Sequence, residues 1–339
     1  MTQSYRDPTS TEHSPMKIVA LLFVIFSIST TPSLAQFSDW KISRTIDGQP
    51  DLQGVWGNNT ITPVERPERF GERQYLTDEE QVLLERRVNE IAEEDGDALF
   101  GDGVFEAALS GVVDSYDPST GNYDQAWLVE RQVHNRTSQI VDPINGKYPP
   151  LTGDARGLTF NRPQRGNTNP ESWLDLTVDD RCISYGAPYL NAGYNSYWQI
   201  IQSKDHVVIV QEMMHDARVI PLTIDHPHVN EKIKLWHGDS RGYFDGDTLV
   251  IETTNFSSKS TFGHNRSRIN IERFTRIGEQ QMLYSLTADQ PDTYKTPYTR
   301  EFILDLTPDP IFEYACHEGN YSMTNILRGA REQERRNSE

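Results

Sequence analysis

The feature that most constrains the fold is a series of short β-type runs that fills most of the chain after Tyr194. The runs are rich in β-branched and aromatic residues, and tight turns separate them. We place them at 197–202, 206–212, 217–222, 248–255, 269–277, 280–288, 299–306 and 311–315. Consecutive strands joined by tight turns pair antiparallel, and this many strands close into a barrel or stack as a sandwich. The sequence therefore predicts a mainly β protein with an antiparallel, β-barrel-like (lipocalin-like) core over 171–330 and few helices.

One helix is predicted before this series. Thr77 and Glu80 have the spacing of a capping box, which begins a helix near 78–94. Its apolar stripe has helical spacing and consists of Leu84, Val88 and Ile91. Because the stripe is narrow and the other positions are charged, we expect a surface helix that lies on the sheet.

The rest of the first half is predicted to wrap around the core. Residues 96–170 are rich in Gly, Pro, Asn and Asp, and only 130–141 has strand character. Scattered aromatic residues in a long, weakly regular stretch are typical of packed wrapping, not of a free linker. We therefore assign 36–170 to an N-terminal wrapping region. At the other end, one or two helical turns over 325–331 precede a charged tail at 331–339.

The first 35 residues predict export. Met16 and Lys17 precede an apolar run at 18–28, and the Ser-Leu-Ala sequence at 33–35 has the small-x-small form of a cleavage site. The run is too short to cross a membrane. Residues 1–35 are thus predicted to be a polar extension followed by a cleavable signal peptide, and the mature protein to be periplasmic or secreted without a membrane span.

Charge and missing motifs narrow the function. The net charge of −18 disfavours nucleic acid and anionic membranes as partners, although a solubilising surface is equally acidic. The sequence has no Gly-rich phosphate loop, no GxSxG elbow and no CxxC pair. We therefore expect no cofactor and a small-molecule substrate or ligand. The chemistry that remains is elimination, hydration, isomerisation or hydrolysis by acid–base side chains. The sequence does not indicate an oligomeric state.

Five long motifs are spread over the chain. They are PDLQGVW (50–56), HDARVIPL (215–222), GDSRGYFDGDTLVIETTNF (238–256), ERFTR (272–276) and YACHEGNYSMTNILRGAR (314–331). Through these motifs the chain resembles an uncharacterised family of exported bacterial proteins. The resemblance covers most of the mature chain. It implies a shared domain and export, and it implies no particular activity.

The two cysteines, Cys182 and Cys316, both lie in the mature chain. In an oxidising compartment they are a candidate disulfide, which would stabilise the fold by about 4 kcal/mol. The alternatives are two buried thiols, or a Cys316 nucleophile beside His317. We favour the disulfide and expect Cα atoms within about 7 Å. It would hold the turn that carries His317.

Two clusters are candidates for catalysis. The first is His215 as a general acid–base, beside the candidate substrate-binding residues Asp216 and Arg218, whose cation suits an anionic group. The second is His317 and Glu318 in a turn, followed by Tyr321 as a hydrogen-bond donor. The alternatives are a charged pair that ends a strand and a turn anchored beside a disulfide.

Two further groups carry polar side chains. Asp239 and Arg241 are candidate substrate-binding residues, although Asp and Gly at this position are equally typical of a turn. Three histidines and two carboxylates in the same region form a possible metal site: His226, His228, His237, Asp225 and Asp239. Exposed loop histidines that bind nothing are the competing interpretation, so we assign no metal ligand.

These residues together predict a cofactor-free enzyme of lyase or isomerase type that acts on a small organic molecule in the barrel cavity. His215 and the His317/Glu318 pair would exchange protons and Tyr321 would donate, while Arg218 or Arg241 would hold an oxyanion. This requires His317 or Glu318 to share a cavity with His215 or Arg218. A non-catalytic small-molecule-binding barrel is the alternative, and a metal-dependent hydrolase is the third possibility.

Overall fold

A computed structural model describes most of the chain after residue 39. The described residues are 40–93, 102–111, 130–153, 155, 169–223, 227–257, 259–260 and 267–339. Residues Trp40–Glu339 form one compact unit. The predicted extension and signal peptide at 1–35 lie outside the described residues.

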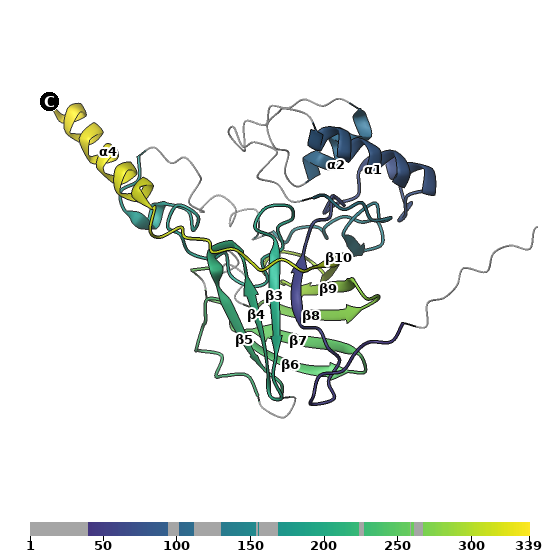
Figure 1. Cartoon of the computed structure of the whole chain (residues 1–339). Coiled ribbons are helices and arrows are strands. Elements are labelled where there is room, and N and C mark those ends of the chain that lie inside the picture. Colours follow the sequence, from purple (N-terminus) through teal and green to yellow (C-terminus); the bar gives the residue numbers. More distant parts are fainter. Residues whose placement is uncertain are drawn as a thin grey trace, which may run out of the picture. The chain divides into compact units, whose positions relative to one another are not determined.

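Ten strands of the described chain form one sheet. They are β1 (Gly54–Gly57), β2 (Ile140–Asp142), β3 (Tyr197–Gln202), β4 (His206–Gln211), β5 (Ala217–Pro221), β6 (Asp239–Asp245), β7 (Thr248–Thr254), β8 (Ile269–Arg276), β9 (Gln281–Asp289) and β10 (Tyr298–Thr307). Their order is β5-β4-β3-β1-β10-β9-β8-β7-β6, and β2 pairs with β10 (Figure 1). All the ladders are antiparallel. The prediction of a mainly antiparallel β protein is confirmed.

The sheet is not closed by a ladder, but its two edge strands meet at one point. Leu222, which follows β5, forms an isolated parallel bridge with Gly242 of β6. The N–H of Thr223 donates to the carbonyl of Gly242 at 2.9 Å. Only a glycine fits here without movement, because a Cβ at 242 would lie 3.0 Å from Cγ2 of Ile220. The two edges therefore touch, while most of their backbone groups do not pair with each other.

Most of the predicted strands are present, and two assignments are wrong. The run at 197–202 corresponds to β3 in both bounds, and the other runs between 206 and 306 differ from their strands by one or two residues. Residues 311–315 form no strand, and 130–141 contributes mainly the short β2. Strand β6 falls where the sequence indicated only a turn. Its Gly242 reflects the close approach of Ile220, which is a contact between distant parts of the chain.

An aromatic cluster lies on the buried face of the sheet. The ring of Tyr284 lies 5.1 Å from Trp198, 5.0 Å from Phe274 and 4.9 Å from Phe302, centroid to centroid. These residues come from β3, β8, β9 and β10 and belong to one apolar core. Period-two alternation explains it, because every second residue of β9 is buried.

Helices α1 (Asp78–Glu93) and α2 (Asp102–Ser110) pack together in a second apolar cluster. The predicted capping box is confirmed: the Glu80 N–H donates to the Thr77 hydroxyl at 3.2 Å, and the Thr77 N–H donates to the Glu80 carboxylate at 2.9 Å. All three residues of the predicted stripe are buried. Helix α2 was not predicted. Short 3₁₀ turns are found at Glu68–Phe70, Trp173–Asp175 and Met213–His215.

Helix α4 (Tyr321–Ser338) is longer than the predicted turn or two, and it continues through the residues assigned to a charged tail. Its last two turns carry four ion pairs at helical spacing, which include Arg336–Glu332 and Arg335–Glu339. Such pairs each stabilise a helix by a few tenths of a kcal/mol, which explains why the helix extends into the residues predicted to be a tail. Among the helices of the described chain, none combines the length and the apolar character that crossing a membrane requires.

Candidate functional site

A cluster of polar side chains, here called the rim cluster, lies where the edge strands β5 and β6 begin. Its members are Ser184, Asp216, His237 and His317. The Ser184 hydroxyl lies 2.7 Å from Nε2 of His237, and the Asp216 carboxylate lies 3.4 Å from the same nitrogen. Neighbouring Trp236 donates its indole N–H to the carbonyl of Ser184 at 2.8 Å. Two segments distant in sequence, one around 184 and one at 236–237, are thus joined by direct hydrogen bonds.

The disulfide brings the fourth member to the cluster. Cys182 and Cys316 are bonded, with Cα atoms 5.6 Å apart, so the predicted disulfide is confirmed and Cys316 is no nucleophile. Ser184 lies two residues after Cys182, and His317 directly follows Cys316. The charge of His317 is one of the smaller influences that lower the pKa of the Asp216 carboxyl.

Backbone strain is concentrated around this cluster. Cys182, Met214 and His215 have φ values of 54°, 61° and 52°, in the left-handed region that side chains other than glycine seldom adopt. Each such residue costs on the order of 1–3 kcal/mol, and such residues gather at functional sites. The turn between β4 and β5 thus holds Asp216 at the rim by a backbone conformation that is itself unfavourable.

Hydrogen bonding determines the protonation state of Asp216. The contact with His237 is the main cause that lowers the pKa of this carboxyl, and Ser184 and the charge of His317 lower it further, while desolvation opposes them. Asp216 is therefore ionised at neutral pH. The Nε2–H group of His237 can donate to the Ser184 hydroxyl or to the Asp216 carboxylate, which lie 2.7 and 3.4 Å from the nitrogen. Because Ser184 and Asp216 meet at one ring nitrogen, they do not form the Ser-His-Asp arrangement in which they hold opposite nitrogens.

The other predicted catalytic residues are on the surface. His215 and Glu318 are exposed, and Tyr321 is 75% exposed at the start of α4. His317 is also exposed, although it is the one residue of its group that acts on the rim cluster. The disulfide brings the chain around His317 near the segment of Ser184, and within the described residues the side chains of His215 and His317 make no hydrogen bond. The expected cavity shared by His317 or Glu318 with His215 or Arg218 stays a prediction.

Arg218 has a different position from Asp216. Its guanidinium makes two hydrogen bonds to Glu272 of β8, at 2.6 and 2.9 Å, and Tyr284 donates its hydroxyl to the same carboxylate at 3.1 Å. Arg218 is 9% exposed and Glu272 is fully buried. Since β5 and β8 are not neighbours in the sheet, this pair spans the interior. Its hydrogen bonds make Arg218 part of the core.

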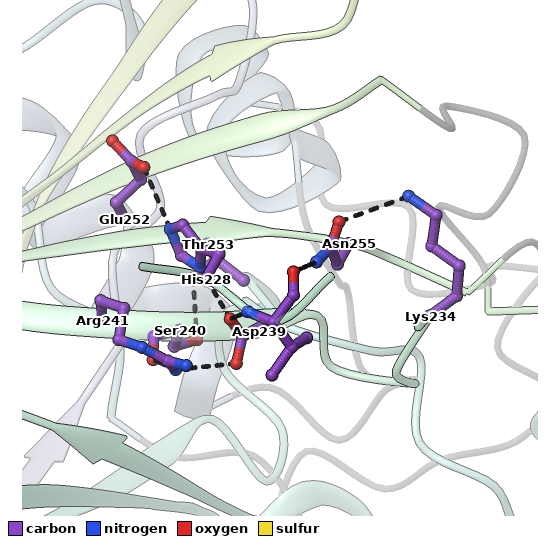
Figure 2. Close-up of polar contacts among 9 residues, drawn as sticks. His228, Lys234, Asp239, Ser240, Arg241, Glu252, Thr253 and Asn255 are labelled. Atoms are coloured by element: carbon purple, nitrogen blue, oxygen red, sulfur yellow. Dashed lines mark hydrogen bonds and ion pairs between the residues drawn. The ribbon is translucent and has the colours of Figure 1, made fainter. Parts of the chain in front are cut away.

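Asp239 and Arg241 belong to a second polar group, on β6 (Figure 2). Arg241 donates to one carboxylate oxygen of Asp239 at 2.7 Å. The other oxygen accepts from the Val229 N–H at 3.0 Å and contacts Nδ1 of His228 at 2.8 Å, while Nε2 of His228 contacts Glu252 at 3.0 Å. These contacts fix the segment at 228–229 onto β6 and β7.

Gly238 separates this group from the rim cluster. Its φ of 74° is open to glycine, and a Cβ there would lie 2.6 Å from the carbonyl oxygen of Thr254. The tight conformation places His237 in one cluster and Asp239 in the other. The possible metal ligands are thus divided, because His237 contacts Ser184 while both ring nitrogens of His228 are engaged by carboxylates. Asp225 and His226 lie outside the described residues, and within the described part of the chain no three His, Cys, Asp or Glu are placed to hold a metal ion.

Desolvation is the largest single influence on Asp239 and raises its pKa. Hydrogen bonds from Val229, His228 and Arg241 outweigh it, so the pKa of Asp239 is lowered. Asp239 is therefore an ionised, nearly buried carboxylate whose hydrogen-bonding capacity is taken up by the protein itself. This arrangement indicates a structural role for Asp239.

Sequence reasoning missed Ser184, and it named His237 only as a possible metal ligand. No motif surrounds Ser184, and its single indication is its position two residues after a disulfide cysteine. His134 and Asp305 were missed as well. They lie 3.7 Å apart, Nε2 to Oδ2, and their pKa values are shifted in opposite directions by burial.

Comparison with known proteins finds no matching family model, no matching curated protein and no matching solved structure. The resemblance to exported bacterial proteins therefore stays a prediction.

Proposed function

We propose that the protein is a cofactor-free acid–base enzyme, of lyase or isomerase type, in which His237 transfers a proton to or from a small organic molecule. The observation that carries this proposal is the convergence of Ser184 and Asp216 on Nε2 of His237. The Cys182–Cys316 disulfide restrains the segment that carries Ser184. Imidazole is the side chain best suited to proton transfer near neutral pH.

The ring of His237 is held through one nitrogen and keeps the other available. Nδ1 has no hydrogen-bond partner among the described residues, and the side chain is 17% exposed. With Nε2 donating towards Ser184, Nδ1 is the basic nitrogen that accepts a proton from the substrate. The ionised Asp216 then stabilises the imidazolium that forms, because its carboxylate lies 3.4 Å from Nε2.

Burial favours a positioning role for Ser184. The residue is 4% exposed, so a substrate has little access to its hydroxyl as a nucleophile. Its hydrogen bond to His237 fixes the ring, and this supports proton transfer in preference to acyl transfer through a covalent intermediate. Compared with the sequence prediction, the acid–base class is retained, while His237 replaces His215 as the residue that transfers the proton.

A panel of metabolites incubated with the protein and followed by mass spectrometry and NMR tests this proposal. Some compounds should gain or lose water, or isomerise. His237→Ala should reduce that turnover at least about 100-fold, as expected for loss of a general acid–base. His206→Ala is the matched control, because His206 is an exposed histidine of the same sheet, and it should retain full turnover. Turnover by His237→Ala at the wild-type rate would contradict the proposal.

A non-catalytic binding protein with a barrel-like interior is the second candidate, and one observation favours it. Asn270 of β8 is fully buried, and its Nδ2 has no hydrogen-bond partner among the described residues. The contact between Leu222 and Gly242 supports the barrel-like enclosure. A ligand that copurifies unchanged, with no turnover across the panel, would favour this candidate. The disulfide supports a periplasmic or secreted location for either function.

A further inference from the structure

A cavity of about 200 Å³ lies on the outer face of the sheet, remote in sequence from the rim cluster. Leu283 of β9 and Ile303 of β10 form its apolar wall, and Tyr75 and His134 of the wrapping region cover it. Strand alternation explains the wall, because the residues on either side of Leu283 and of Ile303 belong to the apolar core. Leu283 and Ile303 are therefore apolar positions on an outer face whose neighbouring residues, such as Glu301, are polar.

A pair of titratable residues adjoins this cavity. Nδ1 of His134 lies 3.2 Å from the hydroxyl of Thr60, and Nε2 lies 3.7 Å from Oδ2 of Asp305. The other carboxylate oxygen of Asp305 accepts from Gln281 at 3.2 Å. Oδ2 itself is buried and has no hydrogen-bond partner among the described residues. A buried polar atom without a partner is unfavourable, and His134, which lies 3.7 Å from it, lines the cavity.

The titratable groups around the cavity are either paired with an opposite charge or favoured in their neutral form. Burial is the main cause that lowers the pKa of His134 and raises that of Asp305, so burial favours the neutral form of each. Arg136 also lines the cavity, and its guanidinium donates to Glu301 at 2.7 Å and lies over the ring of Tyr75. A charged molecule in this space would find no free counter-charge among these residues, and burying an unpaired charge is costly.

We infer that this cavity is a second binding site, which takes an uncharged molecule of single-ring size that carries one hydroxyl group. Size supports this class, because an apolar cavity of about 150 Å³ binds benzene, and this one is slightly larger. The apolar wall would contact the ring. The hydroxyl would bond at the polar end of the cavity, where His134 belongs to the lining.

Phenol is the probe that tests the inference with the full mature chain. In an NMR titration at pH 7, phenol should shift the ring resonances of His134 and saturate at millimolar concentration. Benzoate and benzylamine, which carry the same ring with a negative or a positive charge, should bind at least about tenfold more weakly. Benzoate binding as tightly as phenol would overturn the uncharged class, and no phenol binding up to its solubility limit would overturn the site.

Filling the cavity gives an independent test. Leu283→Trp should weaken phenol binding at least about tenfold, whereas Val219→Trp, at a position on β5 that is 59% exposed, should leave it unchanged. Ile303→Phe is the second filling variant, and it is used if Leu283→Trp does not fold. Unchanged phenol affinity in a folded filling variant would show that phenol binds elsewhere and would overturn the assignment of this cavity.

Discussion

Two polar residues that lie two positions apart, Asp216 and Arg218, belong to regions with opposite properties. Arg218 lies in the interior, where its guanidinium and the hydroxyl of Tyr284 both donate hydrogen bonds to the carboxylate of Glu272. Asp216 lies in the rim cluster, where its side chain is 45% exposed and its partner His237 keeps one nitrogen open. The interior network is complete without a ligand, and the rim cluster is not.

The comparison shows why residue type alone does not identify a site. Both residues are charged and both are candidates for substrate binding, yet only Asp216 has a neighbour, His237, with a ring nitrogen that makes no hydrogen bond among the described residues. Stability measurements on substituted proteins can show what holds each region together, and how much a carboxylate contributes in a covered and in an exposed position.

The largest effect is expected from the disulfide that holds the rim cluster. Replacing both cysteines, Cys182→Ser with Cys316→Ser, removes a cross-link over 134 residues and should lower the free energy of unfolding by about 5 kcal/mol. Urea denaturation followed by circular dichroism measures the change. Wild-type protein under a strong reductant is the control and should lose the same amount. A loss below about 1 kcal/mol would show that the rim does not depend on this bond.

Breaking the interior pair should cost nearly as much. Arg218→Met leaves the fully buried Glu272 without its partner, which should lower the free energy of unfolding by about 3–5 kcal/mol. The double variant Arg218→Met with Glu272→Gln should lose less than the single variant, because it leaves no unpaired charge. Arg273→Met is the control, since its ion pair with Asp245 is exposed and should contribute less than about 1 kcal/mol. A single variant as stable as this control would contradict the proposed structural role.

An intermediate effect is expected at Asp239, which faces outward but is covered. Asp239→Asn should lower the free energy of unfolding by about 1–3 kcal/mol, because one carboxylate oxygen that accepts a hydrogen bond becomes a donor that faces donors. Glu252→Gln is the matched control, at a side chain that is 47% exposed, and it should change stability by less than about 1 kcal/mol. Thermal unfolding of both variants at pH 7 measures the difference, and equal shifts would remove the distinction.

The smallest effect on stability belongs to Asp216, and it depends on pH. Because the folded-state pKa of Asp216 is lowered, its ionised form stabilises the fold above the unfolded-state value of about 4, and this contribution is lost as pH falls through the folded-state pKa. Asp216→Asn should therefore be slightly less stable than wild type at pH 7 and equally stable at pH 2–3. Exposure limits the difference to less than about 1 kcal/mol. A difference that grows as pH falls would reverse the assigned sign.

The antiparallel sheet was predictable because alternation and turn chemistry are local signals. Strand β3 and the start of α1 illustrate this, since each is defined by its own residues. The strand β6 and the helix α2 were missed for the opposite reason. Position 242 of β6 is a glycine because the side chain of Ile220, on the other edge strand, leaves little room for a Cβ. A nine-residue helix such as α2 is only marginally stable until it packs on a neighbour. Both depend on contacts between distant segments.

The candidate site was predictable only in part. The disulfide follows from the cysteine count and the predicted compartment, and it joins the chain around 317 to the segment around 182. Alternation could not place Asp216, because the positive φ values of Met214 and His215 interrupt the strand pattern just before it. Ser184 and the cavity beside His134 have no sequence signature, since each site exists only where separate segments meet.

The position of β1 has a consequence for how the chain folds. This strand lies between β3 and β10, so the first strand of the sheet pairs with the last one. Until β10 has been synthesised, one edge of β1 has no partner, and joining the two ends requires closing a very long loop. Proteins with many such non-local pairings fold in milliseconds to seconds, not in microseconds. The sheet of this protein therefore cannot be completed before β10 has been synthesised.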